Sequence, residues 1–309
     1  MARPLAVAAA QMGPVQRDDS RQSVVARLIE LMREAHARGC RLVVYPELAL
    51  TTFFPRRHRE VEDDPEQWFE RQMPGAATRP LFEEAARLGV GFYLGYAELA
   101  AEGGETRYYN SAVLVDGSGA VIGKFRKVHL PGHRELMPEY EYQYSEKSWF
   151  SHGNLGFPTF AGFGGTMGMC ICNDRRFPET FRVLGLRGAE LVMLGFNTPV
   201  SVPWIREPLT EFHSQLCMQA GAYQNGYYVV GVGKTGGEEV DHLMGGSCIV
   251  SPRGEIVALV EKRGEDALAV ATIDLDEATT GREHTFNLAL HRQPQAYGPI
   301  VEQVGGPES

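Results

Sequence analysis

The sequence has few cysteines, no long apolar run and no cluster of basic residues, and each absence argues against a class of protein. No apolar run approaches the ~18 residues that a membrane-spanning helix needs, and the apolar stretch at residues 5–10 is too short for the core of a signal peptide. Five cysteines in 309 residues are odd in number and too sparse for a disulfide framework, which favours a reduced, cytoplasmic protein. The formal net charge is −9 without any Lys/Arg-rich run, which argues against nucleic acid or an anionic membrane as the main partner.

The spacing typical of zinc ligands is also missing. Cys170 and Cys172 are separated by one residue, and the sequence contains no Cys-x2-Cys pair. His129 and His133 flank Leu-Pro-Gly, which breaks the helix that would bring both rings to one face. We therefore expect no metal site.

The sequence does contain a regular alternation of predicted strands and helices. Apolar periodicity predicts strands at 5–12, 42–45, 90–96, 111–115, 120–125, 166–171, 191–196, 227–232, 248–250 and 255–260. Helices are predicted from Ser20 to Gly39 and at 80–88, 178–188 and 209–224. No repeat, linker or charge block marks a boundary, so we expect one α/β domain over residues 1–309. Residues 276–309 show little periodicity and are expected to form a C-terminal tail that packs at a subunit interface.

Two charged side chains follow predicted strands, where α/β folds collect their sites. Glu47 lies between Pro46 and Leu48 after an apolar strand, so it would be partly desolvated and suited to act as a general base. Lys127 alternates with Arg126 and shares the face of Phe125, which points it toward the interior, where it can donate to an oxyanion. Taken alone, each segment is better interpreted as an ordinary surface feature: Glu47 as a surface glutamate and Lys127 as part of a solvated basic strand end.

The third segment, residues 169–178, reads Met-Cys-Ile-Cys-Asn-Asp-Arg-Arg-Phe-Pro. Cys172 would lie on a turn between a strand and a helix, where helix N-terminal amides favour the nucleophilic thiolate. Cys170 fits a buried core thiol. Arg175 and Arg176 offer bidentate donors for a carboxylate, and we expect at least one of them to bind substrate.

Together these segments carry a family resemblance. Pro-Glu-Leu-x-Leu, Lys-x-Arg-Lys-x-His-Leu and Cys-Asn-Asp-Arg-Arg-x-Pro-Glu, in this order, resemble the nitrilase (carbon–nitrogen hydrolase) superfamily, and the match runs from residue 5 to the tail. The resemblance implies a four-layer α-β-β-α sandwich, a homodimer or homotetramer, and no cofactor. It implies a catalytic triad of Glu47, Lys127 and Cys172, with Glu146 as an assisting second glutamate.

Within the superfamily, the residues after the nucleophile resemble the N-carbamoyl-D-amino acid hydrolases. Further similar segments are residues 50–55, 130–133, 197–199 and 291–295. This resemblance implies that a small substrate bearing a carboxylate is bound by Asn173, Arg175, Arg176, Asn197 and Thr198. The sequence departs from the pattern at Tyr144, where those enzymes usually have histidine, and over residues 200–208, which lack their His- and Pro-rich loop. Trp204 and Ile205 in this loop would form an apolar wall that prefers large apolar side chains.

We therefore expect a cytoplasmic amidohydrolase that converts N-carbamoyl-D-amino acids to the D-amino acid, ammonia and carbon dioxide through a cysteine thioester. Alternatives are a carbamoyl-β-amino acid hydrolase, an amidase for a carboxylate-bearing amide, or a catalytically silent binding module with the same fold.

Overall fold

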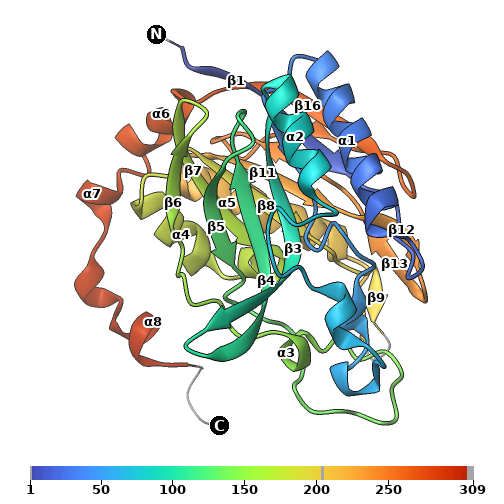
Figure 1. Ribbon diagram of the computed structural model, residues 1–309. Helices are drawn as coiled ribbons and strands as arrows, with labels where there is room; N and C mark the ends of the chain where they lie inside the picture. The colour runs from blue at the N-terminus through green and yellow to red at the C-terminus, as the bar shows by residue number, and fades with distance from the viewer. Residues whose placement is uncertain (1, 203–204, 305–309) are drawn as a thin grey trace.

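Two β-sheets stacked face to face form the centre of the molecule in the computed structural model, which describes residues 2–202 and 205–304 (Figure 1). Within these residues each large sheet has six strands. The first sheet has the order β16 (Ala267–Asp274), β1 (Pro4–Gln11), β2 (Leu42–Val44), β3 (Gly91–Glu102), β4 (Glu105–Val115) and β5 (Val121–Arg126). The second has the order β15 (Ile256–Leu259), β14 (Cys248–Val250), β11 (Tyr228–Gly233), β8 (Leu191–Phe196), β7 (Gly165–Ile171) and β6 (Thr159–Gly162).

Both sheets have parallel strands at their centre and antiparallel strands toward their edges. In the first sheet β1, β2 and β3 are parallel, and in the second β7, β8 and β11 are parallel. Because β4 runs antiparallel to both β3 and β5, strand β5 has the same direction as β2. The carboxyl ends of β2 and β5 therefore lie at one edge of the first sheet, which is where sites form in α/β proteins.

Helices cover the outer face of each sheet. Helices α1 (Arg21–Ala37) and α2 (Arg79–Leu88) pack on the first sheet, and α4 (Pro178–Leu186) and α5 (Thr210–Asn225) pack on the second. The predicted four-layer α-β-β-α sandwich is therefore confirmed. Helix α1 begins after Ser20, as predicted, and the Ser20 side chain accepts a hydrogen bond from the Ser23 N–H at 3.1 Å.

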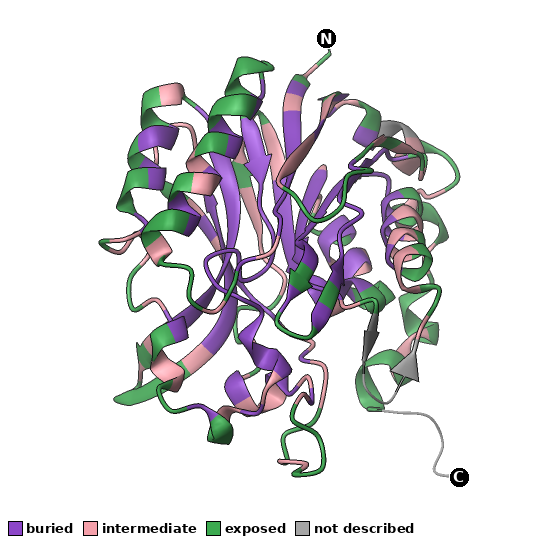
Figure 2. Cartoon of the chain, turned by 90° about the vertical axis from the view of Figure 1, so that its right-hand side faces the viewer, coloured by how far each residue is buried: buried purple, intermediate pink, exposed green. Residues whose placement is uncertain are grey.

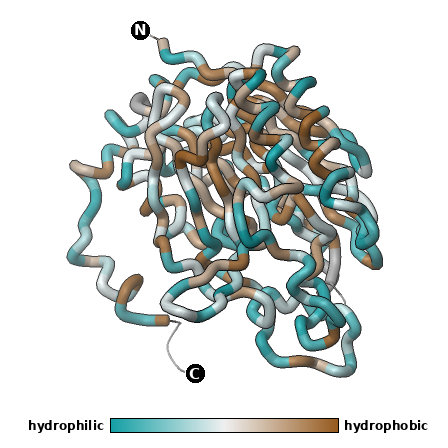
Figure 3. Tube along the Cα trace, in the orientation of Figure 1, coloured by the Kyte–Doolittle hydropathy of each residue, from teal (hydrophilic) through white to brown (hydrophobic). Residues whose placement is uncertain are grey.

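Side-chain alternation along the strands produces the layers. On β1, Val7 joins the apolar cluster between the two sheets, whereas Ala8 joins the cluster beneath α1 and α2. Figure 2 shows that buried residues follow the strands while the outer faces of the helices are exposed. The hydropathy trace has the same layout, with apolar segments in the centre and hydrophilic segments at the rim (Figure 3). The core is therefore built mainly from the strands.

A rim of short elements covers one end of the sandwich. It contains 3₁₀ helices at Phe54–Arg56, Arg59–Val61 and Pro65–Trp68, helix α3 (Glu146–Trp149), and two hairpins, β9 (Ser201–Val202) with β10 (Ile205–Arg206) and β12 (Thr235–Glu238) with β13 (Asp241–Met244). Aromatic side chains hold the rim together: the Phe54 ring centroid lies 4.7 Å from that of Trp149 and 5.6 Å from that of Trp68. This packing fixes α3, and with it Glu146, relative to the loop after β2.

The structure contains several strands that the sequence did not predict, namely β6, the two hairpins of the rim and, near the C-terminus, β16. Strand β16, which no sequence pattern predicted, pairs antiparallel with β1 along its whole length. The tail beyond it forms α6 (Glu277–Glu283), α7 (Leu288–His291), a 3₁₀ turn at Pro294–Ala296 and α8 (Gly298–Glu302). In Figure 1 this tail runs down the outside of the molecule, on the side of α4. Within the described residues, no helix is both long and apolar enough to cross a membrane.

Candidate active site

Glu47 lies between the two sheets, directly after β2, and its side chain is completely buried. The backbone at Pro46 and Glu47 passes very close to β8. A Cβ atom at Gly195 would lie 2.4 Å from the Glu47 nitrogen, so only glycine fits there. Gly95 on β3 is similarly close, since a Cβ there would lie 2.7 Å from the Glu47 Cα. A glycine in each sheet therefore makes room for the loop that carries the carboxylate.

Lys127 connects two carboxylates. Its Nζ lies 2.7 Å from Glu47 Oε1 and 2.7 Å from Glu146 Oε2, and all three side chains are buried. Asn110 on β4 donates from Nδ2 to Glu47 Oε1 at 2.8 Å, and the Asn197 N–H donates to Glu47 Oε2 at 2.9 Å. Both oxygens of Glu47 thus have fixed partners. As the strand alternation predicted, Lys127 points inward, whereas Arg126 binds Glu98 on the other face of β5.

The charges of this cluster are strongly coupled. Burial opposes the ammonium form of Lys127, but the negative charges of Glu146 and Glu47 outweigh it and raise the pKa of Lys127. Burial raises the pKa of Glu146 to about 7, although the Lys127 charge acts in the opposite direction. Near neutral pH the site therefore holds a permanent ammonium beside a carboxyl group that can gain or lose a proton.

Cys172 follows β7 and begins a 3₁₀ turn (Cys172–Arg176) with φ of 45°, a left-handed conformation that is rare for a residue with a side chain. The turn is held by Asp174, whose carboxylate accepts the Ile171 N–H at 3.0 Å and the His129 N–H at 2.9 Å. Burial and the charge of Glu47 raise the pKa of the Cys172 thiol, although Lys127 and Arg175 lower it. The sequence predicted that helix amides would favour the thiolate, but in this structure burial dominates, so the thiol needs a base.

The two adjacent arginines have different environments. Arg175 is 2% exposed and donates to the Cys172 carbonyl at 2.7 Å, to Thr198 Oγ1 at 2.9 Å and to Ser214 Oγ at 3.1 Å. It is not among the described residues that line the cavity. Its guanidinium holds the nucleophile turn against β8 and α5, which differs from the substrate-binding role expected of it. Arg176 is exposed and lines the cavity.

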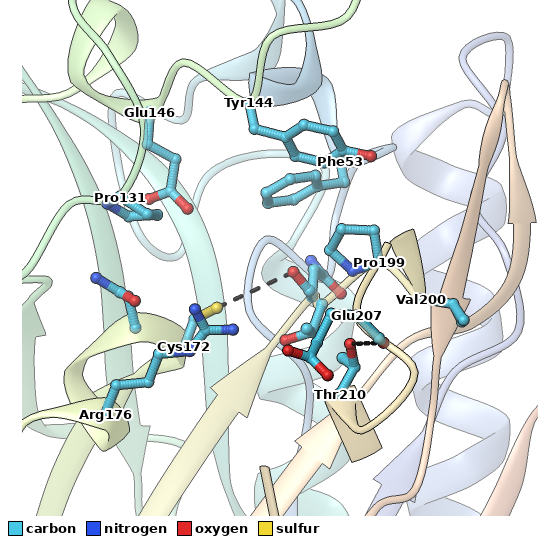
Figure 4. Close-up of a pocket in the computed structure, with 13 residues that line it drawn as sticks. Phe53, Pro131, Tyr144, Glu146, Cys172, Arg176, Pro199, Val200, Glu207 and Thr210 are labelled. Atoms are coloured by element: carbon cyan, nitrogen blue, oxygen red, sulfur yellow. Dashed lines mark hydrogen bonds between the residues drawn. The ribbon is translucent and has the colours of Figure 1, made fainter. Parts of the chain in front are cut away.

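A cavity of about 310 Å³ opens beside Cys172 (Figure 4). Its described lining residues are Phe53, Pro131, Tyr144, Glu146, Cys172, Asn173, Arg176, Asn197, Thr198, Pro199, Val200, Glu207 and Thr210. The cavity is large enough for a small substrate only. Of the loop that departs from the expected pattern, Val200 and Glu207 reach the cavity wall, whereas Trp204 lies outside the described residues and the side chain of Ile205 is not described.

Asn197 is one of the residues that line this cavity. Its Nδ2 donates to the Glu47 carbonyl at 2.7 Å, and its Oδ1 is buried without a hydrogen-bond partner among the described residues. A free carbonyl oxygen suits an N–H group of a ligand, not the carboxylate that the sequence interpretation gave it. Of the other predicted contacts, Asn173 lines the cavity and donates from Nδ2 to the His129 carbonyl at 3.2 Å.

The wall formed by Phe53 and Tyr144 is supported by a second buried charge cluster. Glu238 accepts the Phe53 N–H at 2.7 Å, the Arg56 Nη2 at 2.9 Å and the Lys234 Nζ at 2.7 Å. All three charged side chains are 0% exposed. The backbone of Arg56 in turn accepts the Tyr144 N–H at 3.2 Å. Glu238 thus fixes one side of the cavity to the body of the protein.

Sequence reasoning missed Asn110, Phe53, Glu207 and the cluster around Glu238. Asn110 had a local signal, because a single amide lies next to the apolar run at the end of β4. The others belong to segments whose contacts are distant in sequence. Among the described residues, no group of three or more His, Cys, Asp or Glu side chains could hold a metal ion.

Comparison with known proteins identifies the family. The family model described as carbon-nitrogen hydrolase matches residues 6–283, which is most of the chain. The chain belongs to this family. The nitrilase-superfamily resemblance of the three motifs is therefore confirmed.

Named relatives span almost the whole chain. The N-carbamoylputrescine amidase of Oryza sativa subsp. japonica is 32% identical, over 97% of this chain and 96% of its own. The citrullinase of Francisella tularensis subsp. tularensis is 26% identical, over 93% of this chain and 95% of its own. The crystal structure of a carbon-nitrogen hydrolase from Helicobacter pylori G27 has a TM-score of 0.81 at 21% identity, over 97% of this chain and 99% of that one, which supports the fold.

Proposed function

We propose that this carbon-nitrogen hydrolase hydrolyses N-carbamoyl amino acids, the D form in particular, to the amino acid, ammonia and carbon dioxide. The observation that carries the proposal is the arrangement around the cavity. Cys172, Glu146 and Arg176 line the cavity, and Lys127 bonds both Glu146 and Glu47 behind this lining. The charges of Glu47 and Lys127 also act on the Cys172 thiol. A ureido group on the thiol side and a carboxylate at Arg176 match these charges.

The mechanism follows from the partners of each side chain. Glu47 accepts the proton of the Cys172 thiol, and the resulting thiolate attacks the ureido carbonyl carbon. The oxyanion of the tetrahedral intermediate is stabilised by the Lys127 ammonium and by the backbone N–H of Asn173. Glu47 returns the proton to the departing nitrogen, the C–N bond breaks, and a thioester remains on Cys172. Glu47 then takes a proton from a water molecule that attacks the thioester carbonyl, and the C–S bond breaks to regenerate the thiol. The product is a carbamic acid, which breaks down to carbon dioxide and the second nitrogen product, ammonia or the amino acid.

Two further residues orient the components. Glu146 contacts Lys127 through both of its oxygens, at 2.8 and 2.7 Å, so it fixes the ammonium where the oxyanion develops. The unpaired Oδ1 of Asn197 accepts a ureido N–H. Arg176 binds the carboxylate bidentately, which a lysine cannot do.

A second candidate function is hydrolysis of a ureido amine without a carboxylate. The relatives favour it, because the most similar one described above is named for N-carbamoylputrescine, and the chemistry at Cys172 would be the same. The two candidates differ at Arg176, which has no anionic partner in a ureido amine.

Ammonia release from a substrate panel tests the proposal. N-carbamoyl-D-alanine, its L enantiomer, N-carbamoyl-β-alanine and N-carbamoylputrescine are compared at equal concentration, with Cys172→Ala as the inactive control. We expect the D compound to have the highest kcat/KM. Preference for N-carbamoylputrescine would replace this proposal with the second candidate, and turnover by Cys172→Ala would refute the mechanism.

We also propose that the chain forms homodimers through the tail and the outer face of α5. Apolar side chains are exposed on both: Phe212 and Leu216 are 56% and 48% exposed, and Leu290 and Val301 are 71% and 85% exposed. Such a surface favours a self-complementary interface. Light scattering of the full chain is expected to give twice the monomer mass, and Leu290→Asp is expected to give a lower average mass. A monomer at all concentrations of the unmutated protein would refute the dimer.

A further inference from the structure

One acidic side chain on the cavity wall takes no part in the proposed chemistry. Glu207 precedes α5, and Figure 4 shows it on the wall of the cavity across from Arg176. Its Oε1 accepts the Leu209 N–H at 2.8 Å, and its Oε2 lies 3.9 Å from His213 Nδ1. The Glu207 side chain is 43% exposed. It is therefore held in place while most of its acceptor capacity remains available to a ligand.

The position of Glu207 has an energetic consequence for any ligand. A substrate that fills a cavity of about 310 Å³ displaces water from the carboxylate. Desolvating a charged group is costly unless the ligand supplies an opposite charge or a donor. An apolar side chain beside Glu207 would leave the carboxylate unpaired, whereas an ammonium or guanidinium group would pair with it.

We infer that Glu207 is a binding subsite for a positively charged group, and that the preferred substrate is a ureido amino acid carrying a cation as well as a carboxylate. This inference rests on the proposed function for the location of the ureido group and the carboxylate. Two arrangements share the chemistry: a cationic side chain on an N-α-carbamoyl amino acid, or an α-ammonium group on an ω-ureido amino acid. This inferred preference for a cationic substrate takes the place of the preference for large apolar side chains that we expected from Trp204 and Ile205.

The test compares two substrates that differ only in charge. N-α-carbamoyl-D-lysine and N-α-carbamoyl-D-norleucine have side chains of equal carbon length, and only the first has an ammonium. We expect the enzyme to favour the lysine compound by about tenfold in kcat/KM, the size of a charge-assisted contact at a half-exposed site. Glu207→Gln retains an oxygen for the Leu209 N–H but removes the charge, so the ratio is expected to fall to about one.

Glu211→Gln is the matched control. Glu211 lies in the first turn of α5, four residues after Glu207. It pairs with Arg263 at 2.8 Å and is not among the described lining residues of the cavity. Its substitution removes the same charge and is expected to leave the lysine-to-norleucine ratio at the wild-type value. Citrulline serves as the second arm: a KM that rises in Glu207→Gln for citrulline, and not for the lysine compound, assigns the cation to the α-carbon.

A binding measurement separates this inference from the proposed function. If no N-carbamoyl compound is turned over, the proposed function is wrong, but Cys172→Ala can still be titrated with free lysine and free norleucine in a calorimeter. We expect lysine to bind about tenfold more tightly, and this difference to vanish in Cys172→Ala/Glu207→Gln. The subsite would be overturned if Glu207→Gln changed neither the lysine-to-norleucine ratio of kcat/KM nor the KM for citrulline. It would equally be overturned if free lysine and free norleucine each bound as tightly to Cys172→Ala/Glu207→Gln as to Cys172→Ala.

Discussion

Replacing Glu146 by glutamine is expected to change how the stability of the protein depends on pH. Burial raises the pKa of Glu146 from its ordinary 4.5 to about 7. Between these two values the folded protein retains a proton on Glu146 that the unfolded chain has lost. Stability therefore falls as the pH rises through this window, because the folded state binds more protons than the unfolded state. The difference between the two pKa values, at about 1.4 kcal/mol per unit, lowers the free energy of unfolding by roughly 3–4 kcal/mol across the whole window.

Urea unfolding at pH 5 and at pH 8, at one protein concentration, measures this effect. Ionisable groups outside the Glu146 cluster have the same surroundings in the wild type and in Glu146→Gln, so their contributions cancel when the two pH-dependent changes are subtracted. Between the two pH values, we expect the free energy of unfolding to fall by up to about 3 kcal/mol more in the wild type than in the variant. Lys127 does not interfere, because its raised pKa affects stability only above its ordinary value of 10.5. Parallel pH dependence in the two proteins would refute the reasoning.

Three further substitutions test other parts of the site. Cys172→Ala is expected to abolish ammonia release while the circular dichroism spectrum stays unchanged. Cys170→Ala, in the core of β7, is expected to retain most of the ammonia release. Activity in Cys172→Ala would contradict the thioester mechanism. In steady-state kinetics, Arg176→Lys is expected to raise KM at least about tenfold for carboxylate substrates but not for neutral amides. Arg175→Lys is expected to impair the turnover of both substrate classes. The reversed pattern would exchange the roles of the two arginines. Gly195→Ala is expected to inactivate the enzyme and to destabilise it by about 1–3 kcal/mol in urea melts, because its Cβ would collide with the Glu47 backbone; near-normal activity would contradict that contact.

Local sequence patterns predicted the parts of the structure that depend on neighbours along the chain. Apolar periodicity located most of the central strands, and the strand alternation pointed Lys127 inward and Arg126 outward. Ser20 marked the start of α1. The family resemblance then linked Glu47, Lys127 and Cys172, which are separated by 80 and 45 positions and would not be grouped by local physics alone.

The parts that could not be predicted depend on contacts between distant segments. Strand β16 pairs with β1, which lies more than 250 positions earlier in the chain. Buried and exposed residues do not alternate regularly along β16. The division of labour between Arg175 and Arg176 depends on Ser214 and Thr198, which approach only in the folded state. The raised pKa of the Cys172 thiol likewise results from burial, which outweighs the nearby positive charges. Each of these features is a property of the assembled sandwich.

The reacting groups are divided between the two sheets, and this division limits which substitutions the interior of the enzyme tolerates. Glu47 and Lys127 belong to the first sheet and Cys172 to the second, so their mutual distances depend on how the sheets slide or rotate over one another. Side chains such as Met169 and Met193, in the apolar interior, set that relative position without touching a ligand. Variation in the interior is therefore constrained by turnover as well as by folding. Mild heat or urea that lets the two sheets shift relative to each other is therefore expected to inactivate the enzyme before the sheets unfold.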